Sequence, residues 1–90
     1  MKKIKITVSG RVQGVFFRAF TYDTALRLNI KGYVKNLYNG NVEAVAIGSE
    51  EDVEKFINEL KIGPLSAHVD NIEIEKLPDS INYDSFKINY

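Results

Sequence analysis

The chain of 90 residues contains no cysteine and only one histidine, His68. Without cysteine it can form neither disulfides nor thiolate zinc sites. A zinc site needs three or four protein ligands, and Asp70 alone beside His68 does not make one. We therefore expect no metal site, and we interpret His68 as a surface residue at the start of a strand.

The chain also has no excess charge of either sign, because its 12 Lys and Arg residues balance its 12 Asp and Glu residues. Proteins that bind nucleic acid or membrane surfaces generally carry a basic excess. No hydrophobic run approaches the length of a membrane span, and the N-terminus has no apolar signal core. These absences predict a cytoplasmic protein that binds neither nucleic acid nor membranes. At this length we expect residues 1–90 to form a single domain around one core.

The spacing of hydrophobic residues predicts five strands and two helices. Alternating apolar residues indicate half-buried strands, and apolar residues three and four positions apart indicate helices. Asn39-Gly40 is a strong hairpin signal, Ser49 is a candidate N-cap for the second helix, and Gly63-Pro64 ends that helix. We expect strands at about residues 3–9, 31–38, 42–47, 69–76 and 85–90, and helices at about 16–28 and 50–62.

This order, βαββαβ with a short fifth strand possible, predicts an α+β, ferredoxin-like sandwich. A four-stranded antiparallel sheet would carry both helices on one face. The alternation in residues 42–47 places Val45 and Ile47 on the other face, together with Tyr33. We expect that face to be open to solvent. Between Val69 and Ile72 the alternation breaks, which indicates a β-bulge.

Residues 9–18, SGRVQGVFFR, join the first strand to the first helix and contain no acidic residue. Gly10 and Gly14 let the backbone turn tightly and approach a ligand. Successive N–H groups of such a loop can form an anion-binding nest, and the helix start adds unpaired donors and a partial positive charge. Arg18, in the first helical turn, can hold a phosphate or carboxylate through two parallel hydrogen bonds. The stretch is therefore a candidate phosphate site.

The sequence excludes several common kinds of phosphate chemistry. No Gly-Lys-Ser or Gly-Lys-Thr follows the loop, and the Gly-x-Gly-x-x-Gly fingerprint is absent, so neither a P-loop NTPase nor a dinucleotide-binding domain fits. The lack of cysteine excludes a cysteine-dependent phosphatase. Ser9 is a nucleophile in principle, but the sequence places no base beside it. We interpret Ser9 as a hydrogen-bonding structural residue.

Two stretches resemble the motifs of one family. Residues 10–18, GRVQGVFFR, resemble the acylphosphatase signature Gly-x-Val-Gln-Gly-Val-x-Phe-Arg. Residues 32–36, GYVKN, with the later Gly40, Val42 and Gly48, resemble the family's Gly-aromatic-Val-basic-Asn motif. Length and element order extend the resemblance over the whole chain. The chain departs from the family at Leu37, where many members carry Thr, and this change could alter substrate positioning.

The resemblance implies hydrolysis of the carboxyl–phosphate bond of a small acyl phosphate to carboxylate and inorganic phosphate. Arg18 would bind the phosphate, and Asn36 would position the attacking water. The resemblance implies neither a metal nor another cofactor. We expect a monomer in which phosphate and sulfate compete with the substrate. Backbone amides of the loop would also bind the phosphate; these belong to Val12, Gln13, Gly14, Val15, Phe16 and Phe17.

Two other functions fit the same topology. An RNA recognition motif would need an aromatic and basic run on a central strand, and residues 42–47 contain neither kind of residue. A non-catalytic domain that binds acyl or carbamoyl phosphate, as similar domains do inside larger maturation proteins, is the other alternative. Turnover of benzoyl phosphate would separate an acylphosphatase from both.

Overall fold

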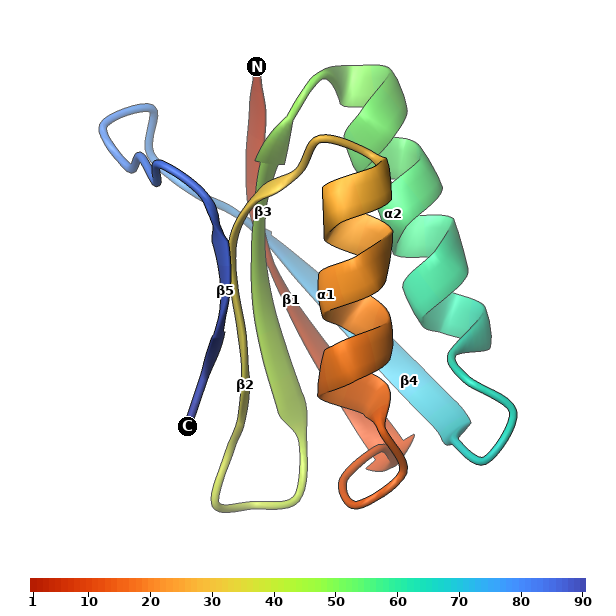
Figure 1. The fold of residues 1–90 in the computed structure, drawn as a ribbon. Coiled ribbons are helices and arrows are strands. Elements are labelled where there is room, and N and C mark those ends of the chain that lie inside the picture. The colour runs from red at the N-terminus through yellow and green to blue at the C-terminus, as the bar shows by residue number, and fades with distance from the viewer.

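The computed structural model describes residues 1–90. Five strands form one sheet, and two helices cover one of its faces (Figure 1). The expected βαββαβ order is confirmed, with a fifth strand at the end. The elements are β1 (Lys2–Arg11), α1 (Phe17–Arg27), β2 (Lys31–Asn36), β3 (Val42–Gly48), α2 (Glu50–Ile62), β4 (His68–Lys76) and β5 (Phe86–Asn89).

The predicted four-stranded antiparallel sheet is confirmed, and the fifth strand makes the whole sheet mixed. Its strand order is β4-β1-β3-β2-β5, and only the β2–β5 pair is parallel. The connection after β4 reverses the chain and carries it to the far edge of the sheet. β5 therefore runs against β4 and in the same direction as β2, next to which it lies. A sequence pattern gives the strand but not the edge at which it pairs.

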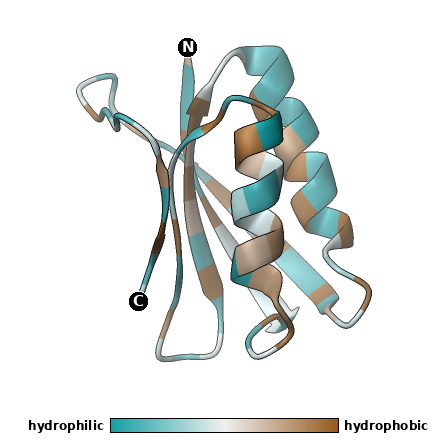
Figure 2. Ribbon diagram, in the orientation of Figure 1, coloured by the Kyte–Doolittle hydropathy of each residue, from teal (hydrophilic) through white to brown (hydrophobic).

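The core lies between the helices and the sheet. In the coloured ribbon, hydrophobic residues recur between hydrophilic ones along both helices and the central strands (Figure 2). Ile4, Ile6 and Val8 alternate inward along β1, as expected, and meet Phe56 of α2 within one hydrophobic cluster. Complete burial of one such side chain stabilises the fold by about 1.5–3 kcal/mol. The same cluster includes Phe17, which fixes the start of α1 against the sheet.

The helix ends follow from local chemistry. Ser49 caps α2 as predicted, because its hydroxyl accepts a 3.1 Å hydrogen bond from the N–H of Asp52. At the end of α1, Asn29 takes a positive φ of 57°. The N–H of Ile30 then reaches back to the carbonyl of Ala25 at 2.8 Å, which completes a Schellman motif. Neither helix has the length and apolar character that a membrane-spanning helix requires.

The second face of the sheet is partly covered, contrary to the expectation of an open face. Val45 is 3% exposed and Ile47 is 5% exposed. The β4–β5 connection crosses this face. Lys3 of β1 donates from Nζ to the carbonyl oxygens of Asp79 (2.5 Å) and Ile81 (2.6 Å) in that connection. Alternation within one strand cannot show that a distant segment returns over it.

The expected bulge is confirmed in β4. Ser9 pairs with Asn71, but Gly10 pairs with Val69, so Asp70 is the extra residue. Gly10 has a φ of 127°, and a Cβ placed there would lie 2.2 Å from the carbonyl oxygen of His68. Only glycine fits this close approach of two strands. The bulge thus bends the sheet where β1 enters the loop before α1.

Candidate functional site

A hollow of about 300 Å³ opens where the β1–α1 loop meets the ends of β2 and β5. We call it the loop pocket, and we use "the loop" for residues 12–16, between β1 and α1. The pocket lies at the end of the molecule opposite the N-terminus (Figure 1). Its lining residues are Val12, Gly14, Phe16, Phe17, Arg18, Ala19, Asn36, Ile88 and Tyr90.

The loop is held by buried side chains while parts of its backbone face solvent. Val12, Val15 and Phe17 belong to the hydrophobic core. Gly14 and Phe16 between them are exposed. The N–H groups of residues 12–16 donate to no other group in the protein. Unpaired amides beside a helix start form an anion-binding surface.

Two residues of the loop have left-handed backbone. Gly14 has a φ of 72°, and a Cβ added there would meet no protein atom within 4 Å. Phe16, with a φ of 63°, caps α1 without a side-chain hydrogen bond. A bulky residue seldom adopts this conformation, and backbone strain of this kind is concentrated at functional sites. The strain at Phe16 places a phenylalanine side chain, 82% exposed, on the rim of the loop pocket.

Arg18 is the second residue of α1 and is the only charged side chain in the lining. Its Nη1 donates to the carbonyl oxygen of Asn89 at 3.5 Å, a long bond. Its guanidinium carbon lies 4.7 Å from the ring centre of Tyr90, within the range of a cation–π contact. Both contacts come from the C-terminal end of the chain. They leave the remaining guanidinium donors free for an anion.

Asn36 ends β2 and lines the same pocket. Its Oδ1 is buried and has no hydrogen-bond partner in the protein. Buried polar atoms are nearly always paired, with protein or with water, so an unpaired acceptor in a pocket wall is a place for a donor. This oxygen is closed off from solvent, so a water molecule would donate a hydrogen to it after a small rotation of the side chain toward the pocket.

Gln13 contacts the turn between β2 and β3. Its Nε2 donates to the carbonyl oxygens of Leu37 and Asn41, both at 2.8 Å. Leu37, where many family members carry Thr, contributes its backbone carbonyl to this contact. The Gln13 side chain therefore joins the loop to the residues that directly follow Asn36.

The structure brings most of the predicted site residues together. Arg18 and Asn36 line one pocket with four of the six residues expected to supply amides, while Gln13 and Val15 lie outside the lining. Sequence reasoning missed Ala19, Ile88 and Tyr90. The last two reach the site only because β5 pairs with β2, and no local pattern in the sequence carries that information.

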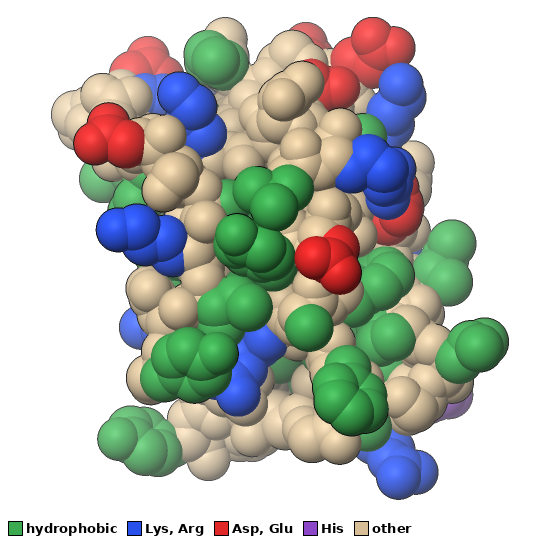
Figure 3. Space-filling view, viewed as in Figure 1, with side chains coloured by type: hydrophobic (Ala, Val, Ile, Leu, Met, Phe, Trp, Pro, Cys, Tyr) green, Lys and Arg blue, Asp and Glu red, His purple; other side chains and the backbone are tan.

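The groups with shifted pKa values lie away from the pocket. Burial, aided by a 2.7 Å hydrogen bond to Glu43, raises the pKa of Tyr33 well above its ordinary value on the second sheet face. A hydrogen bond to Glu59 raises the pKa of Arg27. The lining itself contains no carboxylate, histidine or lysine side chain. On the face drawn in Figure 3, acidic side chains lie in the upper and middle parts, and hydrophobic side chains occupy the middle and lower parts.

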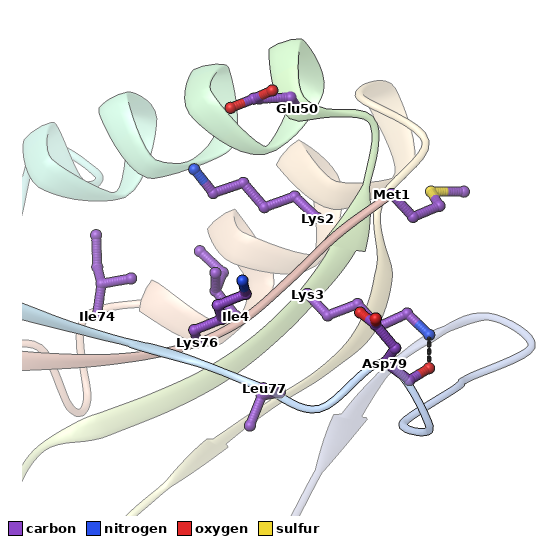
Figure 4. Close-up of a pocket in the computed structure, with 9 residues that line it drawn as sticks. All are labelled: Met1, Lys2, Lys3, Ile4, Glu50, Ile74, Lys76, Leu77 and Asp79. Carbon is purple, nitrogen blue, oxygen red and sulfur yellow. Dashed lines mark hydrogen bonds between the residues drawn. The ribbon is translucent and has the colours of Figure 1, made fainter.

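A larger hollow of about 550 Å³ lies at the opposite end, beside the N-terminus (Figure 4). Lys2, Lys3 and Lys76 line it together with Glu50 and Asp79. The amine of Lys3 is already bonded to the β4–β5 connection, with the Asp79 carbonyl drawn as its partner. The remaining lining offers no nucleophile paired with a base and no group of amides. The smaller loop pocket is therefore the better candidate.

His68 lies exposed at the start of β4, as the sequence predicted, with its Nε2 3.0 Å from the Asp70 carboxylate. Neither residue lines the loop pocket. Ser9, also expected to be structural, donates a 3.4 Å hydrogen bond to the carbonyl of Asn71 across the β1–β4 pair. None of these side chains is placed to take part in chemistry at Arg18.

Known proteins share both this sequence pattern and this fold. The acylphosphatase family model matches residues 4–88. An acylphosphatase of Archaeoglobus fulgidus is 47% identical, with all of both chains aligned. The crystal structure of acylphosphatase from Bacillus subtilis matches with a TM-score of 0.96 at 34% identity and covers all of both chains. HypF from T. kodakarensis matches with a TM-score of 0.87 at 41% identity over all of this chain but 12% of its own. The motifs, the loop pocket and these matches together place the chain in the acylphosphatase family.

Proposed function

We propose that the loop pocket is the active site at which this chain hydrolyses acyl phosphates, the activity of its family. The loop amides and Arg18 bind the phosphoryl group, and Asn36 holds the attacking water. The single observation that carries this assignment is the unpaired Oδ1 of Asn36 in the wall of a pocket that also contains Arg18. One wall offers anion donors and another offers an acceptor for water.

Asn36 can orient water but cannot deprotonate it, because an amide has no basic site at neutral pH. If the water donates a hydrogen to Oδ1, one of its lone pairs is free to point at phosphorus. Holding two reactants in line can supply a large part of a rate enhancement. The role of Asn36 is therefore orientation, not acid–base catalysis.

The reaction needs little more than this. The water oxygen forms a bond to phosphorus while the bond between phosphorus and the bridging carboxyl oxygen breaks. The carboxylate leaves with the electron pair, so no general acid is required. The water's protons end on the phosphate oxygens. In the loose transition state of phosphoryl transfer, catalysis consists mainly of positioning and charge stabilisation, which Arg18 and the loop amides supply.

The acyl group would leave the pocket between two aromatic side chains. Phe16 and Tyr90 both line the pocket, and Tyr90 is 97% exposed. With the phosphoryl group at the loop, the rest of a small substrate would lie against one or both rings. This arrangement supports apolar and aromatic acyl phosphates as substrates.

We also propose that phosphate and sulfate compete with substrate, since both present tetrahedral oxygens to the same amides and to Arg18. We propose further that the chain acts as a monomer and that residues 1–90 act as one acylphosphatase-like domain around a single hydrophobic core. The cytoplasmic location stays a prediction from the sequence.

The match to a segment of the longer protein HypF leaves a second candidate, a domain that binds acyl or carbamoyl phosphate without turnover. Benzoyl phosphate separates the two functions. An acylphosphatase releases benzoate and phosphate at a rate proportional to enzyme concentration, and inorganic phosphate inhibits it competitively. The same rate should persist in EDTA. A protein that binds phosphate but leaves benzoyl phosphate at its spontaneous rate of hydrolysis would support the non-catalytic alternative.

A further inference from the structure

The two parts of the loop pocket belong to separate segments of the chain. The anion-binding part is the loop with Arg18, and the water-binding part is the end of β2 at Asn36. Only one residue joins the loop to the turn after β2 by side-chain hydrogen bonds. That residue is Gln13, whose Nε2 donates to the carbonyl oxygens of Leu37 and Asn41, each at 2.8 Å.

The turn that Gln13 contacts is closed by bonds of its own. The N–H of Leu37 donates to the carbonyl of Asn41 at 2.8 Å, and the N–H of Gly40 donates to Leu37 at 3.2 Å. The side chain of Asn39 accepts from the N–H of Asn41 at 3.0 Å. Residues 37–41 are therefore a compact unit attached directly to Asn36. A side chain that holds this unit also holds the end of β2.

We propose that Gln13 is a positioning residue that fixes the distance between the bound phosphoryl group and the water on Asn36. This inference rests on the proposed function of the loop pocket. The backbone of Gln13 belongs to the loop, while its half-buried side chain uses both amide hydrogens on the turn. The side chain of this single residue thus couples the two parts of the site without itself touching the reacting atoms.

The expected consequence is a loss of kcat without a loss of anion affinity. Gln13→Met keeps nearly the same length and removes both donors, so the turn can move relative to the loop. The loop amides and Arg18 lie in one contiguous segment and should still bind phosphate. Misplacement of a reactant by about 1 Å can cost on the order of a hundredfold in rate. We expect kcat for benzoyl phosphate to fall roughly tenfold to a hundredfold, with the inhibition constant of phosphate within about twofold of wild type.

Ser66→Ala is the matched control. Ser66 donates from its hydroxyl to the carbonyl oxygen of Val15 at 3.3 Å, so it also contacts the loop through one side chain. It follows α2, however, and has no connection to Asn36. Removal of this hydrogen bond should leave kcat within about twofold of the wild-type value. If Ser66→Ala and Gln13→Met lower kcat equally, the effect reports general loosening of the loop, and the proposal is wrong.

A double-variant cycle tests whether Gln13 acts through Asn36. If it does, adding Gln13→Met to Asn36→Ala should lower kcat little further, because the positioned water is already lost. If the two substitutions lower kcat independently, so that their factors multiply in the double variant, the proposal is contradicted.

Gln13→Glu provides a second test of the two hydrogen bonds. Its carboxylate has no hydrogen to donate at neutral pH, but its protonated form has one, so kcat should rise below about pH 5, near the ordinary pKa of a Glu carboxyl.

A binding measurement tests the role of Gln13 separately from the proposed hydrolytic function. In NMR titrations with inorganic phosphate, the side-chain amide of Asn36 should shift in the wild type and shift much less in Gln13→Met, at equal phosphate affinity. The Asn36 shift could depend on Gln13 in a wild type that does not hydrolyse benzoyl phosphate. That result would overturn the proposed function but support the role of Gln13 in positioning Asn36. An active wild type with the same Asn36 shift in both proteins would overturn the role of Gln13.

Discussion

The guanidinium of Arg18 lies 4.7 Å from the ring centre of Tyr90, although Arg18 belongs to the first helix and Tyr90 follows the last strand. The carbonyl of Asn89 accepts from the same guanidinium at 3.5 Å. Parallel pairing of β5 with β2 brings both contacts to the pocket. Asn89 and Tyr90 thus restrict the position of the Arg18 guanidinium at the pocket.

Arg18→Ala should abolish most turnover while the fold survives. Removal of one preorganised donor to a developing anion typically costs about 10²–10³ in kcat. Arg18→Lys should also be poor, because an ammonium cannot reproduce the two-pronged geometry of a guanidinium. Initial rates with benzoyl phosphate, and phosphate affinity by calorimetry, measure both effects.

Arg27→Ala is the control for this pair of variants. Arg27 lies at the other end of α1 and bonds to Glu59 of α2 at 2.6 and 2.7 Å. Loss of the Arg27 side chain should leave turnover of benzoyl phosphate unchanged. Near-normal activity in Arg18→Ala or Arg18→Lys would remove Arg18 from the mechanism.

Asn36→Ala should lower kcat by roughly two orders of magnitude and leave phosphate affinity close to wild type, because a positioning group acts mainly on the transition state. Asn36→Asp should be poor as well, with weaker anion binding, because a carboxylate beside the bound phosphate repels it. Steady-state kinetics with a phosphate inhibition series separates kcat from KM. Asn58→Ala, at an exposed position of α2, is the matched control.

The pH dependence of kcat tests whether the site works without an acid or a base, as the role given to Asn36 requires. No carboxylate, histidine or lysine side chain lines the loop pocket, so kcat of the wild type should be nearly flat between about pH 5 and 8. A bell-shaped profile in that range would reveal an acid or base outside the proposed set. Full kcat with a raised KM in Asn36→Ala would mean that Asn36 binds substrate instead of water.

Gly14→Val should weaken the anion site and destabilise the fold. A left-handed φ of 72° is strained for a β-branched residue by about 1–3 kcal/mol, and the added side chain would project into the space beside the loop amides. Gly40→Val is the control, because Gly40 also has a positive φ, 94°, with no protein atom within 4 Å of an added Cβ, and lies outside the pocket lining. Urea denaturation should show losses in both variants, whereas phosphate affinity should fall only in Gly14→Val.

The raised pKa of Tyr33 should make the free energy of unfolding fall in alkaline solution. Burial raises its pKa above the value in the unfolded chain, which is about 10. Above that pH the native state holds a proton that the unfolded state has released, so the free energy of unfolding falls as pH rises. Below about pH 10 this contribution is fully present. Tyr33→Phe should lose less stability than wild type between about pH 10 and 12, as measured by urea denaturation at each pH. Parallel losses in the two proteins would contradict the assignment.

Elements set by nearby residues could be predicted from the sequence. Alternation gave the inward face of β1, and Ser49 with Gly63 gave both ends of α2, because strand period and helix caps depend on neighbours in the chain. The edge at which β5 pairs and the cover over Val45 depend on contacts between distant segments. No local pattern encodes them, so the pairing of β5 could not be predicted and the expected open face was wrong.

The residues of the candidate site also include some that nearby sequence predicts and others that it does not. Gly14 and Arg18 could be proposed from physical chemistry, because a glycine loop before a helix with an arginine is an anion site in its own right. Asn36 needed the family resemblance, since an asparagine at a strand end has no distinctive pattern. The side-chain role of Gln13 and the stacking of Tyr90 on Arg18 became visible only in three dimensions.

The central claim is that water held by Asn36 attacks phosphorus, not the acyl carbon. Hydrolysis of benzoyl phosphate by the wild-type protein in ¹⁸O-labelled water tests it directly, because attack at either centre gives the same two products. Mass spectrometry of both products should find the label in inorganic phosphate and none in benzoate. Label in benzoate would mean that water adds to the carbonyl carbon, and the roles given to Arg18, the loop amides and Asn36 would be wrong.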